Sequence, residues 1–289
     1  MDLLTEELSL AIFSCIQAAK VVSEIYNAPF SVEWKAKDDP LTEADLQANK
    51  IISDFIQTKY PNDGFLSEEA VDDLTRLKKQ RIWILDPIDG TREFVDKNPE
   101  FSISLGLSLN GKASLGVVLN PITRELFYGN VEKGIGYLLL DEEFNFDYDN
   151  IRLEKPFFIS KEFSKPTILV SRSELLKSKL FDRDEFWKNE FTIFPVGSIA
   201  YKLALISVGK AHFTISLKPK SEWDICAGVA LVLAAGGICM DIVEQKDFIF
   251  NKEKPFDQGI LAGNKDFILD FLKDKSIFLK KSFVDTKER

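Results

Sequence analysis

Two aspartates, Asp86 and Asp89, are the residues of this sequence best suited by type and spacing to carry out chemistry. They follow a short apolar run at residues 82–85 and precede Gly90 and Thr91, so we expect a buried strand that ends in a tight turn. Paired carboxylates beside exposed backbone N–H groups are typical of a site for Mg²⁺ and phosphate. A turn without chemical function explains the same stretch, because Asp, Pro and Gly dominate turns.

Further acidic residues stand at expected helix starts elsewhere in the chain. Asp45 follows Thr42 in a pattern that either completes a helix cap or supplies a carboxylate that orients a water nucleophile. Glu68 and Glu69 follow a short apolar segment, where acids favour the first turn of a helix. Asp224 precedes a run of small and apolar residues, and N-capping of that helix is its simplest explanation.

The composition of the 289 residues is that of a globular protein with a sizeable core. The 37 basic and 46 acidic residues give a net charge of −9, which argues against binding to nucleic acid polymers or anionic membranes. A small anionic substrate remains compatible, because a bound cation can reverse the local field. The acidic N-terminus does not resemble a signal peptide, and we expect no membrane-spanning segment.

The cysteines and the single histidine restrict the chemistry further. Cys15, Cys226 and Cys239 lie in apolar surroundings without a CxxC pair, which indicates buried thiols and a reducing, cytoplasmic setting. A single histidine excludes a histidine-rich zinc site, and His212 lies in an alternating run typical of a strand, which disfavours a catalytic Ser-His-Asp triad. Hydrolysis by this chain would most naturally use carboxylates and a metal.

Two halves with different patterns hold these residues in place. Helical spacing predicts helices over residues 2–26 and 43–59, packed on a largely antiparallel sheet. Residues 141–164 mark the expected boundary between a domain of residues 1–150 and a domain of residues 151–289, in which strands and helices alternate. Other expected elements are strands over 82–85, 101–109, 113–119, 123–129, 135–140, 167–171, 191–196, 211–217 and 238–242, helices over 199–208 and 225–235, and an exposed linker or lid over 70–80.

Three motifs occur together in this chain: Asp-Pro-Ile-Asp-Gly-Thr at residues 86–91, Ser-Glu-Glu at 67–69 and Trp-Asp at 223–224. Their combination resembles the lithium-sensitive, Mg²⁺-dependent phosphatases of the inositol monophosphatase superfamily, and the resemblance extends from Asp39 to Asn264. It implies a layered α/β fold, an alternating α-β-α-β-α sandwich of the inositol monophosphatase and fructose-bisphosphatase type. We expect a small phosphorylated substrate and a monomer or homodimer.

The resemblance also implies how two or three Mg²⁺ ions are held. Glu68, Asp86 and the backbone carbonyl of Ile88 would hold one ion. Asp86, Asp89 and Asp224 would hold a second, and Glu68 would face a third, looser ion. Carboxylates with one carbonyl suit Mg²⁺, and two metals stabilise both the entering and the leaving oxygen of an in-line displacement.

The same resemblance implies the phosphate contacts and the catalytic residues. The N–H groups of Gly90 and Thr91 would hold the phosphate. Thr91, hydrogen-bonded to Asp45, and Glu68 would position the attacking water. No activated nucleophile is evident in the sequence, which fits a reaction without a covalent enzyme intermediate.

Several positions favour the bacterial CysQ-type 3′(2′),5′-bisphosphate nucleotidases within the superfamily. Arg-Glu-Phe at residues 92–94 stands where inositol monophosphatases usually have Thr-Asn-Phe. Lys218 and Lys220 occupy the loop in which those enzymes present an acid to inositol, and lysines suit a second phosphate. Gly197 and Ser198 loosely match a Gly-Ser motif of CysQ proteins and are further candidates for substrate binding.

Hydrolysis of adenosine 3′,5′-bisphosphate to AMP and phosphate is therefore the leading hypothesis. An inositol-1-monophosphatase or a broad sugar phosphatase is the alternative within the fold, and a phosphate- or nucleotide-binding regulator is the alternative outside catalysis. Lys35, Lys37 and Lys202 have no assigned role: the first two lie in a polar loop that folds over an anion or stays solvated, and Lys202 lies one place late for the CysQ motif.

Overall fold

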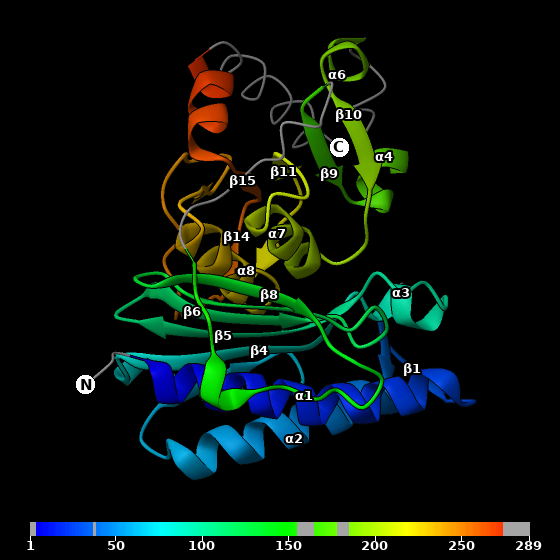
Figure 1. The fold of residues 1–289 in the computed structure, drawn as a ribbon, viewed down its shortest axis with the longest axis vertical. Coiled ribbons are helices and arrows are strands. Elements are labelled where there is room, and N and C mark those ends of the chain that lie inside the picture. The colour runs from blue at the N-terminus through cyan, green and yellow to red at the C-terminus, as the bar shows by residue number, and fades with distance from the viewer. Residues whose placement is uncertain (1–3, 37–38, 155–164, 178–184, 274–289) are drawn as a thin grey trace.

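The computed structural model describes most of the chain: residues 4–36, 39–154, 165–177 and 185–273. Helices α1 (Thr5–Asn27) and α2 (Glu43–Lys59) form one outer layer and support a six-stranded sheet (Figure 1). Helices α7 (Ile199–Ser207) and α8 (Glu222–Ala234) separate this sheet from a five-stranded sheet, which further helices cover. This α-β-α-β-α order confirms the expected fold class.

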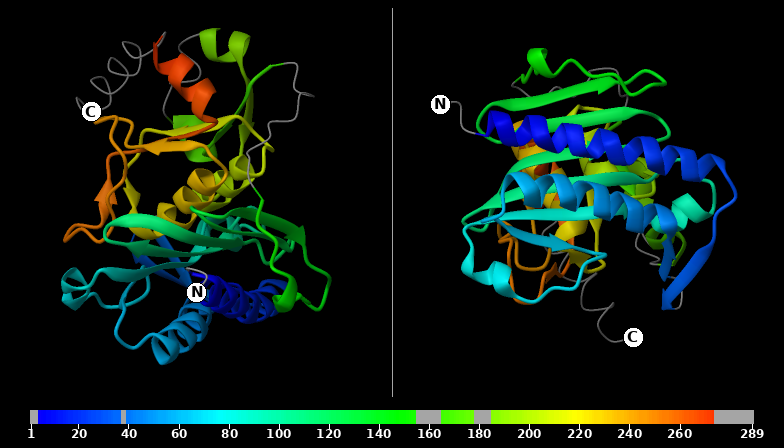
Figure 2. Two further views of the ribbon diagram at one scale, coloured as in Figure 1. Left: turned by 60° about the vertical axis from the view of Figure 1, so that its left-hand side comes forward. Right: turned by 90° about the horizontal axis from the view of Figure 1, so that it is seen from below.

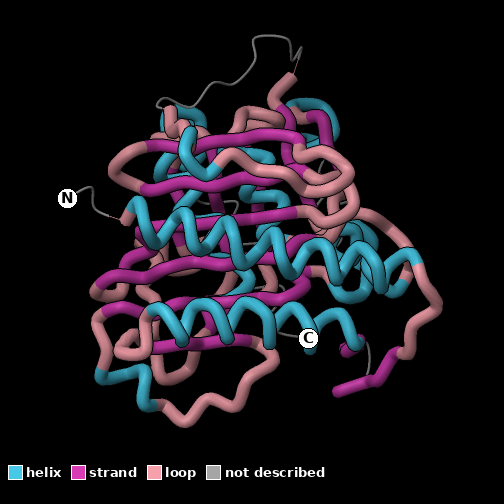
Figure 3. Tube along the Cα trace, turned by 60° about the horizontal axis from the view of Figure 1, so that its bottom comes forward, coloured by secondary structure: helices cyan, strands magenta, loops and turns pink. Residues whose placement is uncertain are grey.

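The first sheet places the ends of two strands side by side at the candidate site. Its strands in spatial order are β3 (Gly64–Ser67), β4 (Arg81–Asp89), β5 (Ser102–Leu109), β6 (Lys112–Leu119), β7 (Glu125–Asn130) and β8 (Gly134–Leu139). Only β3 and β4 are parallel within this sheet. Because they run in the same direction, Glu68 follows β3 beside the end of β4, and its N–H donates to the carbonyl of Leu85 (3.2 Å). Figure 3 shows α1 and α2 in front of these strands.

The second sheet is mixed and comes from the second half of the chain. Its spatial order is β10 (Thr192–Pro195), β9 (Thr167–Val170), β11 (Phe213–Ser216), β15 (Ile260–Gly263) and β13 (Ile238–Met240). Strand β9 is parallel to both of its neighbours, whereas β15 is antiparallel to both of its own. The remaining elements are β1 (Val32–Ala36) paired with β2 (Asp39–Thr42), β12 (Lys220–Ser221) paired with β14 (Phe256–Asp257), α3 (Thr91–Val95), α4 (Arg172–Lys177), α6 (Glu185–Glu190), η1 (Thr75–Lys78) and η2 (Tyr148–Asn150).

The two halves share their middle layer. The strands of the first sheet end at residue 139 and those of the second begin at residue 167, on either side of the expected boundary at 141–164. Part of that boundary, residues 155–164, lies outside the described residues. Helices α7 and α8 belong to the second half but contact strands of both sheets, as Figure 2 also shows. The candidate site can therefore draw residues from both halves.

Three local expectations differ from the structure. Residues 67–69 form the end of β3 and a turn rather than the start of a helix, because Ser67 is paired in the sheet. Residues 70–80 are not a wholly exposed lid, since they contain η1 and the buried Arg76 (2% exposed). Ser221, not Asp224, is the N-cap of α8, and Asp224 occupies the third helical position in a capping box.

Helix α1 differs from the expectation that no segment is long and apolar enough to span a membrane. Its 23 residues meet that criterion by length and composition, with a mean hydropathy of 1.5 over the apolar window. Half of that window is buried inside the fold. Ala11, Ile12 and Cys15 are fully buried in the core between α1, α2 and the first sheet, which explains the apolar composition of this helix.

Glycines bring α8 close to the first sheet. Gly106 on β5 pairs with Gly116 on β6, and both face α8. A Cβ at Gly116 would lie 2.2 Å from the carbonyl oxygen of Ala227, and one at Gly106 would lie 2.7 Å from the sulfur of Cys226. Real Cβ atoms do not approach backbone oxygens so closely, so these positions fix how α8, and with it Asp224, is seated.

Gly116→Ala should therefore destabilise the protein by about 3 kcal/mol or more, because α8 must shift to admit the methyl group. Gly236→Ala is the matched control: Gly236 has φ +83° and no atom within 4 Å of an added Cβ, so its cost of about 1–2 kcal/mol comes from backbone conformation alone. Urea unfolding of both variants measures the difference. Equal losses would contradict the close packing of α8.

Candidate active site

The candidate active site is built around the carboxyl end of β4. A β-bulge interrupts the pairing of β4 with β5 here: Asp86 pairs with Ser104, and Asp89 pairs with Ser102. The N–H of Ile88 donates to Asp86 Oδ1 (3.0 Å), so the strand end folds around a carboxylate that is only 2% exposed. The bulge thus places both aspartates of the motif at the same end of the sheet.

Gly90 and Thr91 form the tight turn that leads into α3. Gly90 has φ +98°, a conformation that glycine adopts without strain, and a Cβ there would lie 3.2 Å from the Cβ of Phe101. The Thr91 hydroxyl lies within hydrogen-bond distance of two acceptors, Asp45 Oδ1 (3.1 Å) and the carbonyl of Ile88 (3.0 Å). The expected contact between Thr91 and Asp45 is therefore present.

Asp45 serves helix α2 and the candidate site at once. Its Oδ2 accepts hydrogen bonds from the N–H (2.8 Å) and the hydroxyl (2.6 Å) of Thr42, which completes the capping box. Its Oδ1 is left for Thr91. Burial raises the pKa of Asp45 to about 6, although the hydrogen bonds from Thr42 lower it partway. Capping and contact with the site are thus compatible in one residue.

Asp89 is held by the N-terminus of α7. Its Oδ2 accepts hydrogen bonds from the Ser198 hydroxyl (2.5 Å) and from the N–H of Ala200 (2.6 Å). The N–H of Gly197 donates to Glu100 Oε2 (2.8 Å). These donors of Gly197 and Ser198 are engaged within the protein, which argues against their expected direct contact with substrate. Sequence reasoning misses Ala200 because a backbone N–H carries no signal in the side-chain pattern.

Asp224 reaches the site from the first turn of α8. The N–H of Ser221 donates to its Oδ2 (2.9 Å). Burial and the charge of Asp89 raise the pKa of Asp224 to about 7, whereas the nearby charge of Lys220 lowers it partway. Lys220 also acts on Asp89, whose pKa is raised by burial and lowered partway by this lysine among other groups. Lys220 therefore lies close to both carboxylates.

Other cations lie further along the same side of the site. Lys218 is exposed, and its Nζ lies 3.2 Å from the hydroxyl of Ser173. Arg172, adjacent to Ser173, pairs with Glu100, the residue that also holds Gly197. This chain of contacts connects the cationic side to the N-terminus of α7. Lys218 and Lys220 thus remain candidates for contact with a substrate anion.

Lys202, in contrast, is not a candidate for contact with a substrate anion. It is 1% exposed, and its Nζ donates to the carbonyls of Val196 (3.1 Å) and Ser198 (3.0 Å). Burial lowers the pKa of Lys202 to about 8. The ammonium group thus stabilises the turn before α7 from inside the protein.

Lys35 pairs with the acids that follow β3. Its Nζ lies 3.0 Å from Glu68 Oε1 and 2.5 Å from Glu69 Oε1. Burial raises the pKa of Glu68 to about 7, and the charge of Lys35 lowers it partway. Lys35 is thus not merely solvated, and it brings the β1–β2 hairpin to the site. Its neighbour Lys37 lies outside the described residues.

The four expected metal-ligand acids are close enough for their negative charges to raise one another's pKa values. Burial raises the pKa of Asp86 well above its ordinary value, and the charges of Glu68, Asp89, Asp224 and Asp45 raise it further. Within the described ranges, however, no three acidic, histidine or cysteine side chains surround one point closely enough to hold an ion. One oxygen each of Asp86, Asp89 and Asp224 is directed to a protein donor instead.

These residues nevertheless fit Mg²⁺ by their chemistry. The donors are hard oxygens only, and Ile88 adds a neutral carbonyl at the turn. For Asp86 Oδ2, Asp89 Oδ1 and Asp224 Oδ1, the described part of the chain provides no hydrogen-bond donor. A divalent cation would offset the repulsion among the buried carboxylates and would bind these remaining oxygens.

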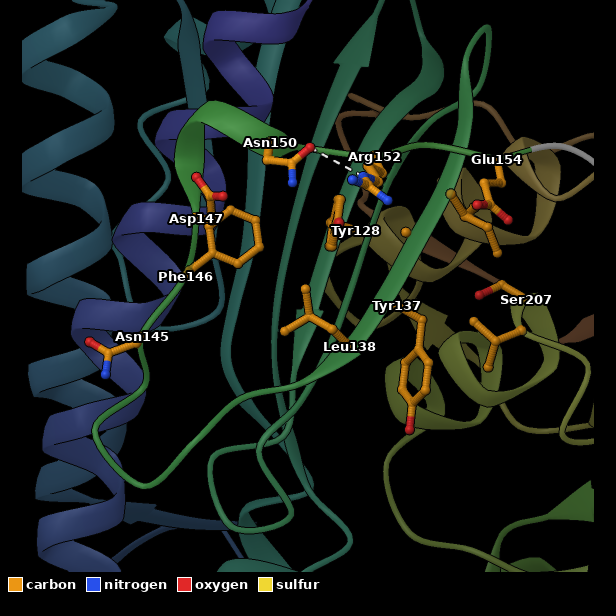
Figure 4. A pocket seen from close by; sticks show the side chains of 13 residues that line it. Tyr128, Tyr137, Leu138, Asn145, Phe146, Asp147, Asn150, Arg152, Glu154 and Ser207 are labelled. Atoms are coloured by element: carbon orange, nitrogen blue, oxygen red, sulfur yellow. Dashed lines mark hydrogen bonds between the residues drawn. The ribbon is translucent and has the colours of Figure 1, made fainter.

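A separate cavity of about 530 Å³ lies beside β8, the outermost strand of the first sheet (Figure 4). Tyr128 and Tyr137 line it from the sheet, and Phe146 and Arg152 line it from the segment that follows β8. None of the expected site residues is among its lining residues. The cavity is thus distinct from the acidic site.

The chain is similar to known proteins over most of its length. A sequence model described as the Inositol monophosphatase family matches residues 4–274. The chain is 30% identical over 266 residues to Nus factor SuhB of Escherichia coli K12, which covers 89% of this chain and 91% of SuhB. It is 32% identical over 223 residues to a fructose-1,6-bisphosphatase/inositol-1-monophosphatase of Thermotoga maritima, which covers 77% and 79%. The crystal structure of CysQ from Bacteroides thetaiotaomicron is similar, with a TM-score of 0.77, 25% identity, and coverage of 91% and 98%.

Mg²⁺ should raise the melting temperature of this protein, because it offsets the repulsion among the buried acids. At a concentration of about 100 times Kd the stabilisation is about 2.7 kcal/mol, which corresponds to roughly 5–10 °C. Asp224→Asn should melt at a higher temperature than wild type in EDTA and respond less to Mg²⁺, because one buried charge is gone. Differential scanning fluorimetry, with NaCl at matched ionic strength as control, measures both effects. Equal Mg²⁺ shifts in the two proteins would remove Asp224 from the ligand set.

Proposed function

The chain belongs to the inositol monophosphatase family, a family of phosphatases, and we propose that its substrate is a 3′(2′),5′-bisphosphate nucleotide. The proposed reaction converts adenosine 3′,5′-bisphosphate to AMP and phosphate. The observation that carries this proposal is the cationic side of the site: Lys220 lies close to Asp89 and Asp224, and Lys218 lies further along. A second phosphate favours cationic donors, whereas an inositol hydroxyl favours a carboxylate.

The family is generally dependent on metal, typically Mg²⁺. We propose that Glu68, Asp86 and the carbonyl of Ile88 hold one ion, and that Asp86, Asp89 and Asp224 hold a second. Glu68 is also the candidate ligand of a third ion. When bound, the ions supply a strong nucleophile at neutral pH and stabilise charge on the transferring phosphoryl group.

The remaining residues orient the water and the phosphate. Asp45 Oδ1 accepts the hydroxyl proton of Thr91 (3.1 Å), which leaves the Thr91 oxygen free to accept a hydrogen bond from the attacking water. Glu68 is the second group proposed to position this water. The N–H groups of Gly90 and Thr91 are proposed to hold the phosphate oxygens at the tight turn. In this proposal the side chains and backbone orient the water and the phosphate, and no covalent intermediate with the protein forms.

Two other functions have some support from the relatives. The Thermotoga maritima relative is named for fructose-1,6-bisphosphatase and inositol-1-monophosphatase activity, which supports a sugar phosphatase or inositol-1-monophosphatase as the alternative. The Escherichia coli relative is named a Nus factor, which keeps a regulatory role as the alternative outside catalysis. We also propose a cytoplasmic setting, supported by the buried free thiols, and inhibition by Li⁺.

A direct comparison of substrates tests the proposed specificity. We expect kcat/KM for adenosine 3′,5′-bisphosphate to exceed that for inositol 1-phosphate. The double variant Lys218→Gln/Lys220→Gln should lower kcat/KM for the nucleotide by about 10- to 100-fold, the effect of losing charged hydrogen bonds, and spare inositol 1-phosphate. Phosphate release at saturating Mg²⁺ measures both. Much faster turnover of inositol 1-phosphate would refute the nucleotidase assignment.

Asp89→Asn should abolish turnover and keep the fold. Loss of this carboxylate removes a proposed metal ligand, so we expect kcat to fall by about 10³-fold or more. The asparagine oxygen can still accept the hydrogen bonds from Ser198 and Ala200, so the circular dichroism spectrum should match that of wild type. Near-normal turnover in this variant would contradict the proposed pair of metal sites.

A further inference from the structure

A buried polar network lies beside the candidate site and takes no part in the chemistry described above. Glu222, the first residue of α8, is fully buried, and its carboxylate accepts hydrogen bonds from the N–H groups of Asn251 (2.6 Å) and Lys252 (2.9 Å). Arg76 of η1 is also buried and donates to Asn251 Oδ1 (2.8 Å) and to the carbonyl of Lys252 (3.0 Å). We call these four residues the Glu222–Arg76 network.

The network connects the two segments that present acids from opposite halves of the chain. Glu68 begins the connection between β3 and β4, and Arg76 lies within that connection. Glu222 shares the first turn of α8 with Asp224. Strand β3, which Glu68 follows, pairs with β4, and α8 packs against β4, so the two segments meet although no strand or helix contains both acids. The packing of α8 on the first sheet places the two segments near each other, and the network adds a direct link between them.

The hydrogen bonds of the network are suited to fix that separation. The Asn251 side chain also donates back to the carbonyl of Arg76 (3.1 Å), so the link runs in both directions. Asp72 binds two nitrogens of Arg76, Nε (3.1 Å) and Nη2 (2.7 Å), which orients the guanidinium group. Charge-assisted and bidentate hydrogen bonds define geometry more sharply than apolar contacts do.

Stability alone gives a poor account of this arrangement. Burying a carboxylate and a guanidinium group costs several kcal/mol of desolvation, and apolar residues of similar volume often stabilise a core as well or better. The carboxylate of Glu222 is fully buried and is bound by two backbone N–H groups. Such groups are useful where orientation matters more than stability.

We propose that Glu222 and Arg76 are positioning residues that, through Asn251 and Lys252, hold Glu68 and Asp224 at the separation required by the two proposed Mg²⁺ sites, which share Asp86. This inference rests on the proposed metal-dependent function. Neither residue touches the substrate or the reacting atoms. Loosening the network lets the η1 segment and the start of α8 move apart, which weakens binding of the cation.

Three variants loosen the network in different ways. Glu222→Gln keeps the shape but replaces one acceptor with a donor, and Arg76→Lys removes the planar fork. Asn251→Gly removes only the side-chain link, and because Asn251 has φ +69°, glycine keeps the backbone and is the variant most certain to fold. Glu253→Gln is the matched control, since Glu253 is exposed in the same loop.

Isothermal titration with MgCl₂, together with thermal unfolding in EDTA, tests the inference. We expect Kd for Mg²⁺ to rise about tenfold or more in the three network variants, the usual effect of residues that orient metal ligands, and to stay unchanged in Glu253→Gln. At saturating Mg²⁺ the variants should regain kcat, with KM for the nucleotide unaltered.

The outcomes separate the two proposals. If wild type binds Mg²⁺ and the network variants bind it equally well with lower melting temperatures, the network is only structural and this inference is wrong. If wild type itself binds no Mg²⁺, the proposed function fails first and the inference falls with it. Asn251→Gly keeps the test valid if Glu222→Gln or Arg76→Lys does not fold.

Discussion

The concentration of negative charge at the carboxyl end of β4 is the constraint on which the rest of the structure depends. Asp86 is buried among carboxylates that all disfavour its ionised form. Such a group persists only where other charges or a cation offset the repulsion. Lys35 on one side and Lys220 on the other supply part of that compensation. The remaining repulsion is what a divalent cation would offset in the proposed metal sites.

The fold delivers each acid by a different local device. The parallel pairing of β3 and β4 brings Glu68 to Asp86, and the bulge in β4 turns Asp89 to the same end of the sheet. The N-terminus of α7 then fixes Asp89, while glycines in the first sheet allow α8 to bring Asp224 close. Because α7 and α8 form the layer common to both sheets, the site depends on both halves of the chain.

The sequence predicts the layers of the fold, and it singles out the acidic residues at the end of β4, because hydrophobic periodicity and short motifs are local signals. The same locality explains the misses. The burial of Arg76 depends on Asn251, far away in the chain, and the pairing of Lys35 with Glu68 joins β1 to the turn after β3. The N-cap of α8 is Ser221 rather than the expected Asp224, and the sequence does not separate the two because both serine and aspartate fit a helix start. Substrate choice stays a proposal, since it depends on Lys218 and Lys220, whose neighbours in space the sequence pattern does not specify.

The carboxylate of Asp45 has two roles, and a substitution there affects both. It completes the capping box of α2, and it also accepts a hydrogen bond from the hydroxyl of Thr91. The stability of the helix and the proposed orientation of the nucleophile therefore depend on the same carboxylate. Laboratory evolution for heat tolerance should therefore leave Asp45 unchanged. Exposed positions of the same helix, such as the Lys50–Asp54 ion pair, are better targets because they lie away from the candidate site.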